Sequence, residues 1–519
     1  EASGGTDFES QIAYISGVGG ATGTIDATGD VIDFQLTDPT FTLPTAGNYF
    51  GWEGLQPGQI VQQPNTDEES YFQGDLEFDV DWGAVNSIKT GLRITEHDVE
   101  QTKFRPIMPR FNGDAEAARL NGSDFTNGTL EVGMDHYTAP RFDAQAVVDY
   151  ANSFIDGYEL ERPGYASLNE ENTAAYVMAT FETEKLRGNV GLRYIQTDVE
   201  TSFYGGDASV TGEFLATNNL TSRSLSTVKS DYSEILPSLN IAYDLNDDLV
   251  LRFSAAEVIS RPNYNDLFGN QALVGFSDAV PGNEAVAQGN VALSPFKAFQ
   301  SDLALEWYFA QGSIASVGLF TKDVDSFPII QNIPNQQIGL ISPDTGVDNW
   351  LLQTKVDGAG ASVNGVEFQF QHALDNGVGF AFNYTYADAE ADSSDTFNDG
   401  NLQLTDGSKN SYNAVVYYEN DKYSARAAYA WRDAYFIREI GFYGGREHQD
   451  FGTLDLSFNW KATDSFDVSL QINNVTEEDS VQIGRDLGTT AVSQRTSFGY
   501  PSYTYQGERR IIIGISARF

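Results

Sequence analysis

Apolar and polar residues alternate with a period of two over most of the chain from about residue 69 to the C-terminus. In residues 466–472, for example, Phe466, Val468, Leu470 and Ile472 alternate with Asp, Ser and Gln. This spacing puts the apolar side chains on one face of an extended strand. The pattern predicts about fifteen strands, near 69–82, 85–99, 170–183, 187–202, 230–244, 248–259, 297–309, 313–325, 355–373, 377–390, 408–419, 422–436, 449–461, 465–476 and 505–519.

The connections between these strands alternate strictly in length. One set consists of turn-forming pairs such as Gly83-Ala84 and Asn420-Asp421. The other set is long and covers 100–169, 203–229, 260–296, 326–354, 391–407, 437–448 and 477–504. A soluble sandwich has no reason to sort its connections in this way, whereas a membrane barrel has short turns at one rim and long loops at the other. Strands of ten or more residues also suit a tilted membrane span of about 9–11 residues. The pattern therefore predicts an all-β fold, a transmembrane antiparallel β-barrel with extracellular long loops.

Charged and aromatic residues fit the same prediction. Alternate strand positions carry Arg252, Asp302, Glu306, Glu367 and Arg426, which a water-filled barrel interior can hold and a dry sandwich core cannot. Aromatic residues gather near the predicted strand ends, where the interfacial girdles of a barrel lie. The competing interpretation is a large soluble β-sandwich with these aromatic residues in its core.

Composition excludes several classes of function. The 519 residues include 74 Asp and Glu against 30 Lys and Arg, a net charge of −44, and no cysteine. Phosphate backbones would repel such a polyanion, so we expect no nucleic-acid partner. The absence of cysteine excludes disulfides, thiol nucleophiles and Cys-ligated metals. No apolar run approaches the roughly 18 residues of a membrane helix.

The sequence pattern also indicates the domain organisation. We find no Pro- or Ser-rich linker, so residues 69–519 are expected to form one barrel with its long loops. Within residues 1–68, residues 6–17 are predicted to form one more barrel strand and 18–68 its extracellular loop.

Several segments of residues 170–519 resemble the C-terminal half of TonB-dependent outer-membrane receptors. The resemblance is carried by Glu234–Tyr243, Asp248–Phe253, Ser260–Tyr264, Gly289-Asn290, Leu293–Pro295, Leu303–Phe309, Gly365–Phe368, Gly407–Asn410, Val416–Glu419 and Leu470–Val475, in this order. These segments are most similar to those of the proteobacterial branch that often takes up oligosaccharides. One departure is Phe296-Lys297, where the family usually has an acidic residue after its Leu-x-Pro.

The resemblance implies a barrel of about 22 strands around an N-terminal plug. Roughly 15–16 strands are seen here and no plug or TonB box, so we expect the numbered chain to begin inside the barrel. It also implies residence in the bacterial outer membrane with its lipid and lipopolysaccharide, and coupling to a TonB–ExbB–ExbD motor through the missing plug. The terminal Phe519 resembles the aromatic tag that the barrel-assembly machinery reads, and it places the C-terminus at the periplasmic rim.

Ligand capture is expected in the outer loops, where aromatic faces stack on sugars and Arg or amide groups supply hydrogen bonds. The candidates are Trp52, Tyr137, Tyr150, Trp350, Tyr435, Arg438, Phe442, Tyr443 and Arg446. For each residue the alternative is that it packs one loop against another.

No catalytic or cofactor motif is found, so an enzyme is not expected. We also predict no cofactor, with Ca²⁺ as the one alternative at the acidic stretches 392–399 and Asp67-Glu68-Glu69, which are otherwise solvated loop tips.

The sequence favours active import of a nutrient across the outer membrane, with an oligosaccharide as first choice and a ferric siderophore as second. The alternatives are a passive outer-membrane pore or adhesin, and a soluble carbohydrate-active β protein.

Overall fold

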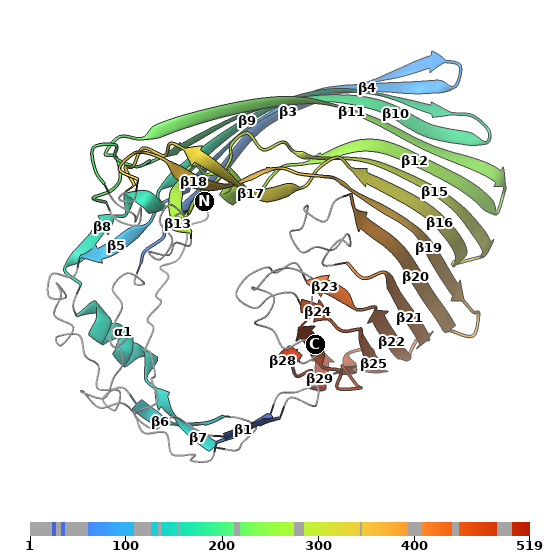
Figure 1. Cartoon of the computed structure of the whole chain (residues 1–519). Coiled ribbons are helices and arrows are strands. Elements are labelled where there is room, and N and C mark those ends of the chain that lie inside the picture. The colour runs from blue at the N-terminus through green and yellow to red at the C-terminus, as the bar shows by residue number, and fades with distance from the viewer. Residues whose placement is uncertain are drawn as a thin grey trace.

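The computed structural model describes residues 23–26, 33–36, 61–107, 126–132, 137–153, 155–211, 218–274, 285–342, 345–392, 407–437, 446–484 and 501–518. It is dominated by one antiparallel sheet of fifteen strands, which is strongly curled and so has a concave and a convex face (Figure 1). The strands are β3 (Asn65–Trp82), β4 (Val85–Gln101), β9 (Ala166–Glu182), β10 (Leu186–Phe203), β11 (Ser226–Asn246), β12 (Leu249–Ser260), β15 (Phe296–Ala310), β16 (Ser313–Val324), β19 (Ala361–Ala373), β20 (Val378–Ala391), β21 (Asn410–Glu419), β22 (Tyr423–Arg432), β25 (Phe451–Thr463), β26 (Phe466–Asn473) and β29 (Arg510–Ala517).

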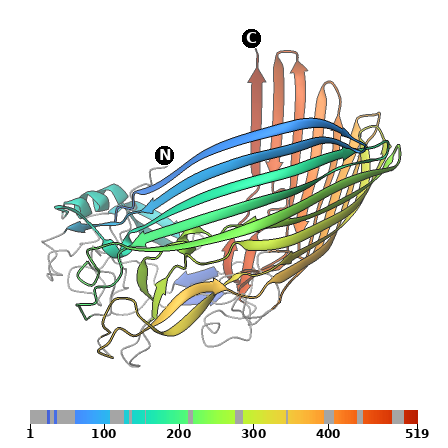
Figure 2. The same ribbon diagram turned by 90° about the horizontal axis from the view of Figure 1, so that it is seen from above.

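The order of these strands in the sheet follows the chain, from β3 at one edge to β29 at the other. Successive strands are joined alternately by a tight turn and by a long connection, so all tight turns lie at one end of the sheet (Figure 2). The turn between β3 and β4 shows why glycine is needed there, because Gly83 has a φ of +71°. The predicted all-β barrel fold is therefore confirmed.

The two faces of the sheet differ in chemistry. The convex face carries apolar residues in cross-strand rows, for example Leu305, Val317, Phe368 and Tyr384, of which Val317 and Phe368 are exposed. The concave face carries paired polar groups, because Arg252 Nε donates to Glu306 (2.8 Å) and Ser254 Oγ donates to Asp302 (2.9 Å). An apolar outer band and a polar interior are the arrangement of a membrane barrel wall.

Among the described residues there are five smaller sheets, of which four form in the long connections and one, β1 with β2, forms in the segment before β3. They are β1 (Gly23–Asp26) with β2 (Asp33–Leu36); β5 (Phe104–Ile107) with β8 (Gly157–Leu160); β6 (Thr126–Val132) with β7 (Tyr137–Phe142); β13 (Gln271–Val274), β14 (Ala285–Gln288), β18 (Trp350–Asp357) and β17 (Pro328–Gln336); and β23 (Tyr435–Ile437), β24 (Arg446–His448), β27 (Ser480–Gly484) and β28 (Pro501–Tyr505). The helices are α1 (Ala144–Asn152), α2 (Tyr264–Leu267) and the 3₁₀ turn η4 (Arg162–Gly164). Among the described residues, no helix combines the length and the apolar character that crossing a membrane requires.

Three predicted strands are each divided in the structure. The prediction 355–373 joins the end of β18 to β19, 422–436 joins β22 to β23, and 505–519 joins the end of β28 to β29. The first division falls at Gly358 and Gly360. A Cβ on Gly360 would lie 2.1 Å from the Val324 carbonyl oxygen, so the backbones cross there at a distance that only glycine permits.

Candidate functional site

A folded-back part of the connection between β12 and β15 covers the outer ends of β9 and β10 on the concave side. We call residues 261–274 and 285–293 the inner cover. Its apolar residues Leu267, Phe268, Val291 and Leu293 pack on Ala166, Leu168 and Val199 of the strands. Ala166 and Leu168 of β9 and Val199 of β10 point to the same face of the sheet, because alternate residues of a strand share a face, and the cover buries them there. The cover is therefore packed against the concave face of the barrel wall through a shared apolar cluster.

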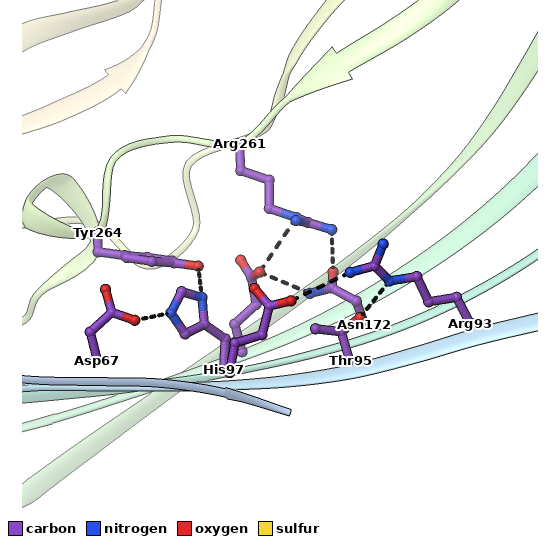
Figure 3. A network of polar contacts seen from close by, with 9 residues as sticks. Asp67, Arg93, Thr95, His97, Asn172, Arg261 and Tyr264 are labelled. Atoms are coloured by element: carbon purple, nitrogen blue, oxygen red, sulfur yellow. Dashed lines mark hydrogen bonds and ion pairs between the residues drawn. The ribbon is translucent and has the colours of Figure 1, made fainter. Parts of the chain in front are cut away.

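A polar network attaches the cover at the ends of β3 and β4 (Figure 3). The Tyr264 hydroxyl of α2 lies 2.6 Å from Nδ1 of His97, and Nε2 of the same ring lies 2.5 Å from Asp67 Oδ1. Burial is the main cause that raises the pKa of Tyr264, and the negative charge of Glu170 adds to it. With its proton retained, Tyr264 donates to Nδ1, and the Nε2 proton of His97 is then directed to Asp67.

A second attachment joins the cover to β9 (Figure 3). Glu170 is a carboxylate whose side chain is only 3% exposed, and Arg261 Nε lies 3.4 Å from it. Asn172 Nδ2 donates to the same carboxylate (2.8 Å), while Asn172 Oδ1 accepts from Arg261 (2.8 Å) and from Thr197 (2.6 Å). Each hydrogen-bonding group of the Asn172 amide thus has a partner, as a buried polar group requires.

Three long connections pack together next to the cover. Trp350 is 3% exposed and packs with Val286, Ile338 and Leu340, and its indole N–H donates to the Leu340 carbonyl (2.8 Å). β14 pairs with β18 in parallel, which joins the connection after β12 to the one after β16. The connection after β10 joins the same body through a hydrogen bond from Gly206 N to the Ile338 carbonyl (3.3 Å).

The sheet of β23, β24, β27 and β28 presents a different surface. Tyr435, His448, Gln482 and Tyr503 stand directly opposite one another across its four strands, so their side chains share one face. Residues two positions away along a strand lie on the same face. We call this surface the tyrosine face, and its members are Tyr435, Arg446, His448, Ser480, Gln482, Tyr503 and Tyr505.

The tyrosines of this face differ in what they offer. Tyr435 stacks on His448 with centroids 5.0 Å apart, and the Arg432 guanidinium lies 4.3 Å from its centroid. By contrast, Tyr503 is 51% exposed and Tyr505 is 64% exposed. Arg446 Nη1 donates to Gln482 Oε1 (2.8 Å) next to Tyr503. The face thus combines exposed aromatic rings with guanidinium, amide and hydroxyl groups.

The structure brings two of the sequence-predicted ligand residues together, Tyr435 and Arg446, on the tyrosine face. Trp350 lies apart from them in β18, and its burial agrees with the alternative that it packs loops together. Tyr137 begins β7 and Tyr150 lies in α1. The residues outside the described parts of the chain are Trp52, Arg438, Phe442, Tyr443 and Phe519. A role in ligand contact remains a prediction for all nine loop residues.

The sequence reading missed the exposed pair Tyr503 and Tyr505 and the attachment residues of the cover. Arg261 and Tyr264 lie within Ser260–Tyr264, a segment noted only for its family resemblance. Glu170 and Asn172 were visible as polar residues at alternate positions of a strand, but their partner Arg261 is 89 or more residues away.

The described parts of the chain offer little support for a metal site. No group of three or more His, Asp or Glu side chains there is placed to hold a metal ion. Asp67 contacts His97, and Glu69 lies 3.4 Å from Arg93. Residues 393–399 of the other acidic stretch lie outside the described residues, and the Ca²⁺ alternative stays a prediction.

A curled antiparallel sheet with an apolar convex face, a polar concave face and long loops at one rim defines the class of outer-membrane β-barrels. The chain belongs to the family of TonB-dependent receptor-like β-barrels, because residues 9–475 match that family's model. Barrels of this family are embedded in the bacterial outer membrane, and the large sheet is a wall within it. A comparison of the sequence with curated proteins gave no significant match.

Solved structures with a similar fold include three receptors. The siderophore receptor PiuA from Acinetobacter baumannii is 13% identical, with a TM-score of 0.52 over 88% of this chain and 56% of that one. The ferric-catecholate import receptor Fiu from E. coli K12 is 16% identical, with a TM-score of 0.53 over 88% and 55%. The ferric yersiniabactin uptake receptor FyuA from Yersinia pestis is 14% identical, with a TM-score of 0.53 over 89% and 55%. The chain thus covers little more than half the length of these receptors.

Proposed function

We propose that the protein to which this chain belongs imports a nutrient across the outer membrane by TonB-dependent transport. Family membership supports this proposal, and so does the wall itself, whose polar concave face surrounds an interior beneath the folded loops. In this scheme ligand binds the outer loops, and a TonB–ExbB–ExbD motor acts on a plug domain to open the path. The chain described here supplies wall and loops and carries out no bond chemistry.

The cargo that the tyrosine face fits best is an oligosaccharide. Sugars bind by stacking on exposed aromatic rings and by hydrogen bonds from guanidinium, amide and hydroxyl groups. The observation that carries this choice is the pair Tyr503 and Tyr505, exposed beside Arg446 and Gln482. The net charge of −44 favours a neutral cargo over a strongly anionic chelate.

The test is calorimetry of the full-length receptor in detergent against a panel of neutral oligosaccharides and ferric siderophores. Saturable sugar binding is expected, and Tyr503→Ala should weaken it roughly 2- to 13-fold, since an aromatic contact contributes about 0.5–1.5 kcal/mol. Tyr503→Phe keeps the ring and should bind nearly as well as the unmodified protein. The matched control is Ile330→Ala, because Ile330 is exposed in β17, in the sheet of β13, β14, β18 and β17.

A ferric siderophore is the second candidate, because the names of the similar solved structures describe siderophore or ferric import receptors. Binding of a siderophore with no response to sugars would replace the oligosaccharide while keeping the import class. Uptake that persists in cells without the motor would instead indicate a passive pore. The aromatic residue Phe519 as assembly signal remains a further proposal of the same scheme.

A further inference from the structure

An apolar groove with a volume of about 450 Å³ lies on the convex side of β21, β22, β25 and β26. Its floor is formed by Ala425 and Ala427 of β22. Their direct cross-strand neighbours are bulky residues that stand above them on both sides, namely Val416 and Tyr418 in β21 and Leu456 and Phe458 in β25. Because alanine carries only a methyl group, the surface is recessed along β22.

Aromatic side chains close both ends of this recess. Tyr423 stacks near-parallel with Phe458 at a centroid distance of 6.2 Å, and Tyr429 packs against Tyr412 at 5.9 Å. Ala425 and Ala427 lie between Tyr423 and Tyr429 on the same face of β22, because alternate residues of a strand share a face. The two tyrosines therefore bound the groove along the strand.

The end of the groove at Tyr423 lies beside the tight turn Asn420-Asp421, at the rim of the sheet where all tight turns gather. In outer-membrane barrels this rim faces the periplasm. Tyr423 (42%), Trp460 (41%) and Phe466 (41%) are exposed there, as residues of an interfacial girdle are. Asn420 Nδ2 donates to the Tyr418 hydroxyl (2.7 Å), so one groove wall has a polar tip at headgroup depth.

We propose that this groove holds one acyl chain of a phospholipid from the periplasmic leaflet of the outer membrane. The groove is continuous with the apolar band that faces the membrane, and its residues Ala425 and Ala427 lie in the half of β22 next to the tight turns. Its walls and ends hold a chain in one orientation, which a smooth barrel surface does not do. The proposal depends on the membrane location of the barrel and not on the identity of the imported cargo.

The test uses the full-length receptor in nanodiscs of phosphatidylethanolamine that carries a photoreactive diazirine in one acyl chain. Cross-links located by mass spectrometry should exceed those on residues 173–179 of β9 by roughly fivefold or more in peptides from 414–431 and 454–460. Ala427→Trp and, independently, Ala425→Phe fill the floor and should bring capture down to the level of β9. Ala175→Trp is the matched control, because Ala175 is exposed on the convex face between Leu92 and Tyr194.

Heat-modifiable gel migration verifies that each variant is folded before the cross-links are compared. Equal cross-linking of all membrane-facing strands would mean annular lipid only and would overturn the proposal. A loss of capture that is as large in Ala175→Trp as in folded Ala427→Trp would overturn it too.

Discussion

At the residue scale, the inner cover depends on groups that are costly to leave unpaired. The Glu170 side chain is almost fully buried, and an isolated buried carboxylate is strongly unfavourable. Arg261 compensates this carboxylate with an ion pair from the cover, and Asn172 donates a hydrogen bond to it from β9. The cover therefore cannot leave β9 without exposing or isolating this carboxylate, which explains why so few polar residues suffice to fix it.

Tyr264 gives this junction an alkaline limit. Its pKa is raised above the ordinary value of 10.0, chiefly by burial. A group whose pKa is higher in the attached state contributes its full stability below the ordinary pKa and loses it as the pH rises above that value. We therefore expect the cover to stay attached up to about pH 10 and to loosen at higher pH.

The chain has no cysteine, so a ¹⁹F label on Ala292→Cys, an exposed position in the cover, reports its motion by NMR. Tyr264→Phe lacks both the ionisable proton and the hydrogen bond to His97. It should be more mobile at pH 8 and respond less to pH between 9 and 11 than the parent protein, following the linkage relation above. Identical pH profiles for the two proteins would show that another group sets the limit.

At the scale of elements, the strands were predictable and the loop sheets were not. Strand periodicity is a local property, and each of the fifteen strands predicted between residues 69 and 519 overlaps one strand of the large sheet. The further strand predicted at 6–17 lies outside the described residues and stays a prediction. The parallel pairing of β14 with β18 joins residues more than sixty positions apart, and no periodicity encodes it. The same limit explains which residues of the tyrosine face could be predicted from the sequence. Tyr435 and Arg446 were selected by residue type, whereas the exposure of Tyr503 follows from a pairing with β27 that only the folded loops establish.

Gly339 and Gly346 offer a matched test of how the loop body is held together. Both have positive φ angles, +84° and +69°, so alanine costs about 1–2 kcal/mol at either position. A Cβ on Gly339 would also meet the Gly206 carbonyl oxygen at 2.9 Å, whereas nothing lies within 4 Å of one on Gly346. Gly339→Ala should therefore destabilise the packing around Trp350 more than Gly346→Ala does.

Hydrogen exchange of the amides of residues 338–342, followed by mass spectrometry, measures this difference. The expected result is faster exchange in both variants and a clearly larger increase in Gly339→Ala. Equal rates in the two variants would mean that the contact with Gly206 does not hold the loops together.

At the scale of the whole molecule, the alternation of side chains divides the wall into a lipid-facing side and a water-facing side, and a single residue step moves a side chain from one to the other. Leu319 of β16 is 52% exposed on the convex face. Ser316 of the same strand lies on the concave face, directly opposite Glu306. An arginine is thus expected to have opposite consequences at these two positions, which are three residues apart in one strand.

Leu319→Arg places a guanidinium in hydrocarbon and should cost about 2–4 kcal/mol if it lies near the midplane of the bilayer. Ser316→Arg places the same group in the interior, opposite Glu306, whose Cβ is about 5 Å away in a cross-strand pair of this kind, and should be tolerated. The folded fraction in isolated outer membranes, read from heat-modifiable migration, is expected to fall for Leu319→Arg and to stay near the parent level for Ser316→Arg. The reverse order would mean that the convex face is not the one in contact with lipid, and the acyl-chain groove would lose its basis together with it.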